Sequence, residues 1–348
     1  MKGDSTNHVW ISDIREDDQV RGQYLVKEKR MGSTKKGDPF LSLILADRSG
    51  DLEARVWERA EELSRLFSEG DILEIEGYAS SYRGQLQLIL SELKAMEGIE
   101  EPDIFLEVTK QDVPRMVGHL KEILRGIEDP HIRELTERFL ADRTFMALFK
   151  KAPAAKSFHH NYIGGLLEHT LSVCRMACLV AEHYRELHRD LLLASAFFHD
   201  IGKVKELSFG GLIEYTDEGR LIGHLSLGMS MLEEKLALLA GFPEDIAFRL
   251  KHLILSHHGE YAFGSPKRPK FLEAFALHLI DDLDAKMNGV KRFMESDRKD
   301  GNWTEFNRLF ERYFLKGGLM AEAQQRMDEP SQEGEIQQGL FARPPSTG

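Results

Sequence analysis

Seven histidine and aspartate residues in the second half of this 348-residue chain have the types and the placement of metal ligands. They are His169, His199, Asp200, His224, His257, His258 and Asp281. Imidazole nitrogens and carboxylate oxygens are suitable ligands for Mn²⁺, Fe, Co²⁺, Ni²⁺ or Zn²⁺. Adjacent residues such as His199 and Asp200 can contact two ions from one helix end, with a water held between the ions. The set therefore predicts a site for one or two divalent ions.

The placement of these residues carries more weight than their number. A single histidine on an amphipathic helix is usually a surface residue or a satisfied core residue. Here the apolar stretch Ala194–Phe198 leads directly into His199-Asp200, and Phe275–Ile280 leads into Asp281. Ionisable groups at the edge of a core are unfavourable unless they are paired or bind a metal ion. The set as a whole thus favours a metal site over a collection of unrelated structural residues.

In this order and context, the seven residues resemble the ligand set of the HD superfamily of metal-dependent phosphohydrolases. The resemblance covers about residues 153–316 and implies an all-α domain that hydrolyses a phosphate ester with one or two divalent ions. It implies core ligands at His169, His199, Asp200 and Asp281. It also implies a second site made by His224 with one or both of His257 and His258.

The same resemblance assigns catalytic roles to Asp200 and to Lys203, which follows the His-Asp pair. Lys203 would contact the scissile phosphate or help to protonate a leaving group. An ordinary exposed lysine is the alternative. Asp284 is interpreted as a supporting or surface residue rather than as a ligand.

Five short segments near the start of the chain alternate apolar and polar residues, as strands with one buried face do. They are Arg21–Arg30, Phe40–Ala46, Leu52–Trp57, Ile72–Ala79 and Gln85–Leu90. A short helical stretch, Glu58–Phe67, lies between the third and fourth. This is the order of elements in an OB-fold. The sequence therefore predicts a five-stranded OB-fold β-barrel, a nucleic-acid-binding module, over residues 8–98.

The remainder of the chain is predicted to be helical. Val113–Ile127 and His131–Lys150 have helical periodicity and are separated by Asp129-Pro130. They belong to a connector and helical segment over residues 99–152. Residues 153–316 are predicted to form the all-α HD domain, with a small hairpin over Leu207–Asp217, and residues 328–348 a disordered tail. The predicted architecture is therefore multi-domain, a β-barrel followed by an all-α domain.

Basic and aromatic residues of the barrel are candidates for holding a nucleic-acid strand. Residues 27–36 contain five basic residues and one acidic residue, whereas residues 1–98 contain 14 basic and 19 acidic residues. Concentrated positive charge suits a phosphate backbone, and exposed rings suit base stacking. The candidates are Lys27, Lys29, Arg30, Lys35, Lys36, Arg55, Trp57, Tyr82 and Arg83. A solvated loop between the first two strands, and aromatic residues that only cover the barrel, are the structural alternatives.

An OB-fold followed by an HD domain resembles the YhaM-type 3′→5′ exoribonucleases, over the chain up to about residue 316. The most specific stretches are residues 158–169 and 277–286. The resemblance implies cleavage of single-stranded RNA from its 3′ end, with DNA as an open alternative. It also implies Mn²⁺ or a similar ion and a homo-oligomer. His159 and His160 are candidate substrate contacts, with capping or packing equally open.

Two other functions stay open at this point. One is hydrolysis of a small cyclic nucleotide or nucleoside triphosphate, because HD domains act on several phosphate esters and a fold alone does not choose among them. The other is a nucleic-acid-binding regulator whose HD site is not catalytic. The complete ligand set disfavours the regulator, and the barrel favours a polymer over a small nucleotide.

The composition limits the partners and the location. The net charge of −12 disfavours binding of nucleic acid by the whole surface and leaves room for a local basic groove. No apolar run reaches the roughly 18 residues of a membrane helix, so no membrane partner is expected. The first residues do not have the apolar segment of a secretory signal, so a cytoplasmic location is expected. Cys174 and Cys178 are expected to be free, buried thiols.

Overall fold

The computed structural model describes residues 8–34, 36–82, 84–96, 104–209, 213–297, 299 and 301–316. The candidate residues Lys35 and Arg83 and the tail predicted over residues 328–348 lie outside these ranges. In the described part of the chain, no helix combines the length and the apolar character needed to cross a membrane.

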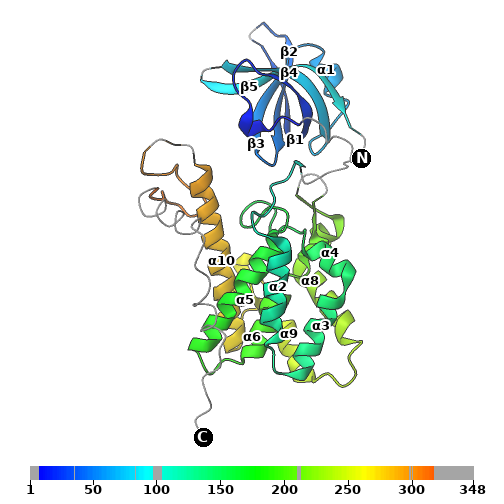
Figure 1. The fold of residues 1–348 in the computed structure, drawn as a ribbon, viewed down its shortest axis with the longest axis vertical. Coiled ribbons are helices and arrows are strands. Elements are labelled where there is room, and N and C mark those ends of the chain that lie inside the picture. The colour runs from blue at the N-terminus through cyan, green and yellow to red at the C-terminus, as the bar shows by residue number, and fades with distance from the viewer. Residues whose placement is uncertain are drawn as a thin grey trace. The chain divides into compact units, whose positions relative to one another are not determined.

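A five-stranded barrel forms the N-terminal part of the chain (Figure 1). Its strands are β1 (Gln19–Ser33), β2 (Pro39–Asp47), β3 (Gly50–Val56), β4 (Ile72–Tyr82) and β5 (Gln85–Ala95). The barrel closes in the order β1-β2-β3-β5-β4, with β3 and β5 parallel and the other pairs antiparallel. The short helix α1 (Ala60–Leu63) lies between β3 and β4. The predicted OB-fold is confirmed.

The alternation in the strand sequences produces the barrel core. Leu52, Ala54 and Val56 on β3 are buried, whereas Glu53 and Arg55 between them are partly exposed. The same period holds on the other strands because successive side chains of a strand point to opposite faces. A short turn, η1 (Ile11–Asp13), contributes Ile11 to this core.

The helical domain follows the connector and contains the predicted metal ligands. Its helices are α2 (Val113–Arg125), α3 (Pro130–Ala141), α4 (Arg143–Phe149), α5 (Gly165–His183), α6 (Arg189–Phe198), α7 (Lys203–Glu206), α8 (Asp217–Leu236), α9 (Glu244–Ser256), η3 (Tyr261–Phe263) and α10 (Leu272–Ser296). The predicted hairpin is present as β6 (Leu207–Ser208) and β7 (Glu214–Tyr215). One continuous apolar core joins the α-helices, with Phe139, Phe197 and Phe198 packed at its centre.

The single helix predicted over His131–Lys150 is wrong, because the structure has two helices there. Asp142 separates them, with the extended backbone of a helix cap, and its carboxylate accepts hydrogen bonds from the amides of Thr144 and Phe145. An aspartate in this position stabilises a helix start by about 1 kcal/mol. Apolar residues continue through the break with little change of period, so periodicity alone did not reveal it.

A second compact unit begins at Gly289, within the last turns of α10. The prediction that the chain is helical up to residue 316 is wrong here. After Ser296, the described residues form two short antiparallel contacts, Trp303 with Leu315 and Asn307 with Arg312. The Lys316 ammonium donates to the carboxylate of Asp297 at 2.6 Å. Side-chain and backbone contacts of this kind, rather than helical periodicity, hold this unit together.

Candidate metal centre

The predicted ligands come from the ends and inner faces of five helices. His169 lies in the second turn of α5, and His199 and Asp200 follow the last residue of α6. His224 lies on α8, His257 and His258 follow α9, and Asp281 lies on α10. The apolar faces that precede these residues pack into the core and carry the polar groups to one place.

Three of the ligands form a first cluster. The Nε2 atoms of His169 and His199 lie 3.1 Å apart, and Nε2 of His169 lies 3.2 Å from Oδ1 of Asp281. Both imidazoles are fully buried.

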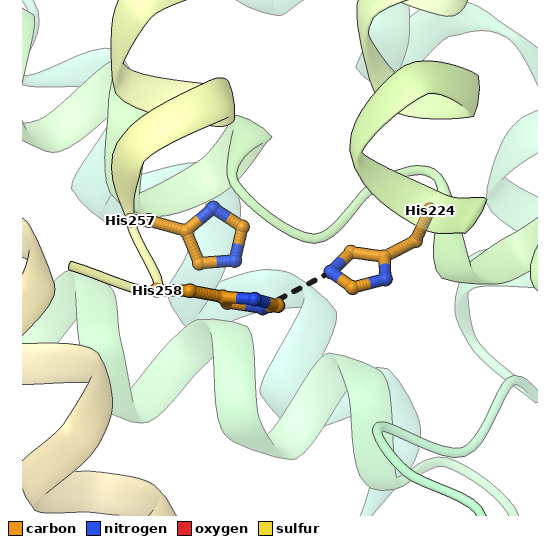
Figure 2. A group of neighbouring side chains, drawn as sticks. All are labelled: His224, His257 and His258. Carbon is orange, nitrogen blue, oxygen red and sulfur yellow. Dashed lines mark hydrogen bonds between the residues drawn. The ribbon is translucent and has the colours of Figure 1, made fainter. Parts of the chain in front are cut away.

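The remaining three histidines, His224, His257 and His258, form a second cluster (Figure 2). The Nε2 atoms of His224 and His258 lie 3.3 Å apart. His257 is buried, whereas His224 and His258 are partly exposed, so solvent reaches the centre on their side.

Asp200 lies between the two clusters and offers one carboxylate oxygen to each. Its Oδ2 lies 3.6 Å from Nε2 of His169 and 3.4 Å from Nε2 of His199. Its Oδ1 lies 3.6 Å from Nε2 of His224 and 3.5 Å from Nε2 of His257. One carboxylate group therefore faces both sets of histidines.

Each of the five histidines uses its Nδ1 atom for a hydrogen bond away from the centre. The Nδ1 acceptors of His199, His257 and His258 are backbone carbonyls, at 2.8 to 3.1 Å. Carboxylates of Asp284 and Glu206 accept from His169 and His224. A carbonyl acceptor requires a proton on Nδ1, and in the neutral ring Nε2 then carries the lone pair. The five rings are therefore oriented to present Nε2 to the centre.

Asp284 supports the first cluster, as one of the two interpretations of this residue predicted. Its Oδ2 accepts from Nδ1 of His169 at 2.7 Å and from Nε2 of His160 at 3.0 Å. Ser172 donates to its other oxygen. The pKa of Asp284 is well below its usual range because these hydrogen bonds outweigh the opposing effect of burial. A charged carboxylate thus fixes the orientation of His169.

Glu206 supports the second cluster and was missed in the sequence. Its Oε1 accepts from both the backbone amide and Nδ1 of His224, each at 2.9 Å. Residue 206 ends α7, the same short helix that begins at Lys203. Its partner is 18 residues further on, beyond the hairpin, so no local spacing could have paired them. Gly202 allows the close approach, because a Cβ there would lie 2.0 Å from the carbonyl oxygen of His224.

The charges of the centre are strongly perturbed. Burial opposes ionisation of Asp200, but Lys203 and the surrounding histidines outweigh it, so the pKa of Asp200 is well below its usual value. Burial lowers the pKa of His258 to about 3, with a further contribution from the neighbouring histidines. Burial also lowers the pKa of His169, but hydrogen bonds to Asp281 and Asp284 outweigh it and raise that pKa to about 9.

The residues present fit divalent ions. Oδ1 of Asp200 and Nε2 of His257 are buried and have no hydrogen-bond partner in the described part of the chain. Buried polar atoms without a partner are unfavourable, and facing lone pairs, as on His224 and His258, repel each other. A cation between these atoms would satisfy them, and nitrogen and oxygen donors suit Mn²⁺, Fe, Co²⁺, Ni²⁺ or Zn²⁺.

The residues predicted on the barrel divide into two groups. The prediction of a basic loop is wrong, because β1 continues to Ser33. Lys27 pairs with Asp51 at 2.5 Å, Lys29 donates to the carbonyls of Ser64 and Phe67, and Arg30 pairs with Glu28 at 2.7 Å. These three cations have partners within the barrel, although Lys27 and Arg30 are exposed. Lys36 is exposed in the turn that follows β1.

Aromatic residues and Arg55 do come together on the outer surface of β2 and β3. The rings of Phe40 and Trp57 lie 5.1 Å apart, and the Arg55 guanidinium lies 5.1 Å from the Phe40 ring centre. Trp57 remains 47% exposed. We call Phe40, Arg55 and Trp57 the barrel face. Tyr82, 59% exposed, lies at the end of β4.

Comparison with known proteins decides the family. A sequence model of the HD domain matches residues 166–286, and one of an OB-fold nucleic acid binding domain matches residues 9–95. The 3′-5′ exoribonuclease YhaM of Bacillus subtilis (strain 168) is 38% identical over 290 residues, 83% of this chain and 91% of that protein. YhaM of Geobacillus sp. (strain WCH70) is 36% identical over 313 residues, 88% and 95% of the two chains. The chain belongs to the YhaM family of 3′-5′ exoribonucleases.

Three candidate residues of this YhaM-family chain adjoin the metal centre without being among its predicted ligands. The Lys203 ammonium is buried, 2.6 Å from Oδ2 of Asp200. His160 is buried and bonded to Tyr162 and Asp284, which makes it a supporting residue. His159 has its ring centre 5.5 Å from that of His169, and its buried Nδ1 has no hydrogen-bond partner among the described residues. Burial and the nearby Lys203 lower the pKa of His159 to about 3, so its ring is neutral near pH 7.

Proposed function

We propose that this chain is a metal-dependent 3′→5′ exonuclease that hydrolyses single-stranded RNA in its HD domain, with the OB-fold holding the strand. The observation that carries the proposal is Asp200, whose two oxygens each face a set of inward-pointing histidine Nε2 atoms. Divalent ions bound there would lower the pKa of a bound water and offset the charge of a phosphate.

The protein's own residues supply orientation and charge for this reaction. Asp284 and Glu206 hold the rings of His169 and His224. The Lys203 ammonium, beside Asp200, is placed to donate a hydrogen bond to a phosphate oxygen, because a cation there stabilises negative charge. His159 has its ring centre 5.5 Å from that of His169 and a buried Nδ1 without a hydrogen-bond partner among the described residues, which makes it a second candidate donor to substrate.

The barrel face supports a polymer as substrate. Phe40 and Trp57 offer rings for base stacking and Arg55 offers a cation for the backbone, which are the elements of single-strand binding. Lys36 and Tyr82 are exposed and remain candidates for the same role. We assign residues 8–98 to the nucleic-acid-binding domain, 99–152 to a connector and helical segment and 153–316 to the hydrolase domain.

We further propose Mn²⁺ as the working ion, two ions per centre, a cytoplasmic location and a homo-oligomer. Two separate histidine sets support two ions. The free thiols of Cys174 and Cys178 are consistent with a reducing compartment.

An apolar stripe on α10 supports the oligomer. It is formed by Leu272, Phe275, Leu279, Leu283 and Met287, all more than half exposed. Residues at this spacing share one helix face, and monomers rarely expose such a surface. The stripe is nearly symmetric about Leu279, as contact with the same helix of a second copy requires.

One experiment tests the proposed activity. Purified protein is incubated with 3′-labelled or 5′-labelled single-stranded RNA, with Mn²⁺ or with chelator. We expect Mn²⁺-dependent release of labelled mononucleotides from the 3′ end, and loss of at least about 10³-fold in rate for Asp200→Ala, which leaves both clusters incomplete. Asp282→Asn is the matched control, because this carboxylate follows the candidate ligand Asp281 in sequence but pairs with Lys286 at the surface. Hydrolysis of small nucleotides alone, or RNA binding without turnover, would contradict the proposal.

A further inference from the structure

Two aromatic side chains project into solvent directly beside the second histidine cluster. The turn after His258 forms the short helix η3, and Tyr261 and Phe263 in it are each 65% exposed. The turn is fixed to the cluster, because the carbonyl of Phe263 accepts from Nδ1 of His258 at 3.1 Å. Ser265 secures its far side by donating to the carbonyls of Leu255 and Lys267. Hydrogen bonds therefore hold the backbone that carries the two rings. The rings are not buried, so packing in a core does not explain their presence.

The same turn is basic, in a chain with a net charge of −12. Residues 260–270 contain Lys267, Arg268 and Lys270 against the single acid Glu260. Arg268 pairs with Glu260 at 3.0 Å. Lys267 and Lys270 are exposed and have no ion pair among the residues that the structure describes. Unpaired cations next to exposed rings complement a strand of phosphates and bases.

The turn also lies on the side from which a substrate can reach the centre. His224, His258 and Asp281 are the ligands that solvent reaches, whereas His169, His199 and His257 are buried. The chain that leads into His224 is apolar and exposed as well, with Leu221 at 86% exposure. Figure 2 shows the ring of His224, on α8, facing the ring of His258, which follows α9. Exposed apolar groups therefore flank the two accessible histidines.

We propose that Tyr261 and Phe263 form a stacking platform for unpaired bases of the strand whose 3′ end lies in the metal centre, with Lys267 and Lys270 on its phosphates. The inference rests on the proposed exonuclease function and adds a binding subsite within the hydrolase domain. Base stacking on aromatic rings tolerates any sequence, because every base has a flat face. The platform would hold the strand as successive nucleotides are removed and would reject bases that are paired.

Binding to RNA with and without bases tests the platform. The full-length double variant Tyr261→Ala/Phe263→Ala is compared with wild type and with Tyr184→Ala, an exposed aromatic at the end of α5. Affinity for 3′-fluorescent single-stranded RNA is measured by anisotropy in chelator, so that no hydrolysis occurs. A second RNA has abasic residues at the second to fourth positions from the 3′ end. We expect the double variant to bind normal RNA about 10- to 100-fold more weakly than wild type, and Tyr184→Ala to bind within twofold.

The abasic RNA separates stacking from a general effect on the fold. On abasic RNA, the affinity of wild type should fall close to that of the double variant. The double variant should bind both RNAs with similar affinity. Lys267→Ala/Lys270→Ala should instead reduce the salt dependence of binding to both RNAs. An equal loss on normal and abasic RNA, or no loss at all, overturns the platform. Failure of wild type to hydrolyse RNA in Mn²⁺ would overturn the exonuclease itself, while the binding comparison would still decide the platform.

Discussion

At the scale of single residues, the centre depends on groups that never touch an ion. Asp284 and Glu206 fix the rings of His169 and His224 from behind, each through the Nδ1 atom. Supporting carboxylates of this kind typically change metal affinity by 10- to 100-fold. The ligand set read from the sequence is therefore only part of what the reaction requires.

We expect Asp284→Asn to weaken Mn²⁺ binding at the first cluster by about tenfold, because the amide cannot supply the charge that orients His169. Isothermal titration with Mn²⁺ measures this directly, and excess Mn²⁺ should restore most of the exonuclease rate. Asp282→Asn serves as the control. A lower Tm with unchanged Mn²⁺ affinity would show that Asp284 is merely structural.

The sequence predicts the seven candidate ligands because each one follows or interrupts an apolar helical stretch and because their order resembles that of the HD superfamily. It placed Asp284 only as support or surface, since the spacing of the HD superfamily favours Asp281 as the ligand. Glu206 was invisible, because its contact with His224 forms only when α7 and α8 pack together. A single sequence shows the types of residues but not which distant residues contact each other in the fold.

At the scale of elements, α8 contains a break that sets the position of His224. Gly223 has φ 77° and ψ 155°, outside the helical region, and His224 follows directly. A Cβ at Gly223 would meet no atom within 4 Å, so only the backbone conformation excludes other residues.

We expect Gly223→Ala to destabilise the protein by about 1–2 kcal/mol, the strain of an L-residue at positive φ, and to displace His224. Urea unfolding and the exonuclease rate measure the two effects. The control is Gly118→Ala in the interior of α2, where a Cβ also meets nothing and the backbone is helical. That substitution should stabilise by about 0.5–1 kcal/mol. Equal stability changes at both glycines would contradict the role of the break.

Asp47 closes the turn between β2 and β3 and makes the barrel sensitive to acid. It accepts from His8, from the amide of Ile11 and from Ser49. Burial opposes its ionisation, but these hydrogen bonds outweigh it and lower the pKa of Asp47. A lowered folded-state pKa means that the stabilisation is present above the unfolded pKa of about 3.9 and is lost as pH falls further.

We therefore expect Asp47→Asn to destabilise the protein by about 1–3 kcal/mol at pH 7, and the difference from wild type to shrink below pH 4. Tryptophan fluorescence during urea unfolding, measured in a Trp303→Phe background, follows the N-terminal part of the chain, which contains the other two tryptophans, Trp10 and Trp57. Asp51→Asn, which removes an exposed pair with Lys27, should have an effect below about 1 kcal/mol. A pH-independent difference for Asp47→Asn would refute the argument.

Helices and strands were predictable where one of their faces is buried. Their ends were missed where a helix cap or strand pairing determines them. The strands follow from period-two alternation, although most of them extend beyond the predicted ends. The break at Asp142 and the extension of β1 to Ser33 depend on a cap and on pairing with β2. Both are interactions with partners that the local pattern does not contain.

At the scale of the whole molecule, the stripe on α10 predicts the assembly state. We expect wild type to be an oligomer in light scattering after gel filtration. Phe275→Glu should raise the protein concentration at which the oligomer forms by at least about 100-fold, because a buried unpaired charge costs several kcal/mol. Leu238→Glu, at a single exposed leucine outside the stripe, should leave the oligomer intact. A monomeric wild type would remove the proposal for the stripe.

The position of Asp200 between the two histidine sets also links their occupancies. One carboxylate group serves both, with Oδ2 towards His169 and His199 and Oδ1 towards His224 and His257. An ion bound in one set would orient that carboxylate for the other set, and by thermodynamic reciprocity each ion would then change the affinity of its neighbour by the same factor. The exonuclease rate would accordingly rise more steeply than the first power of the metal-ion concentration, so that the enzyme becomes active over a narrow range of metal supply.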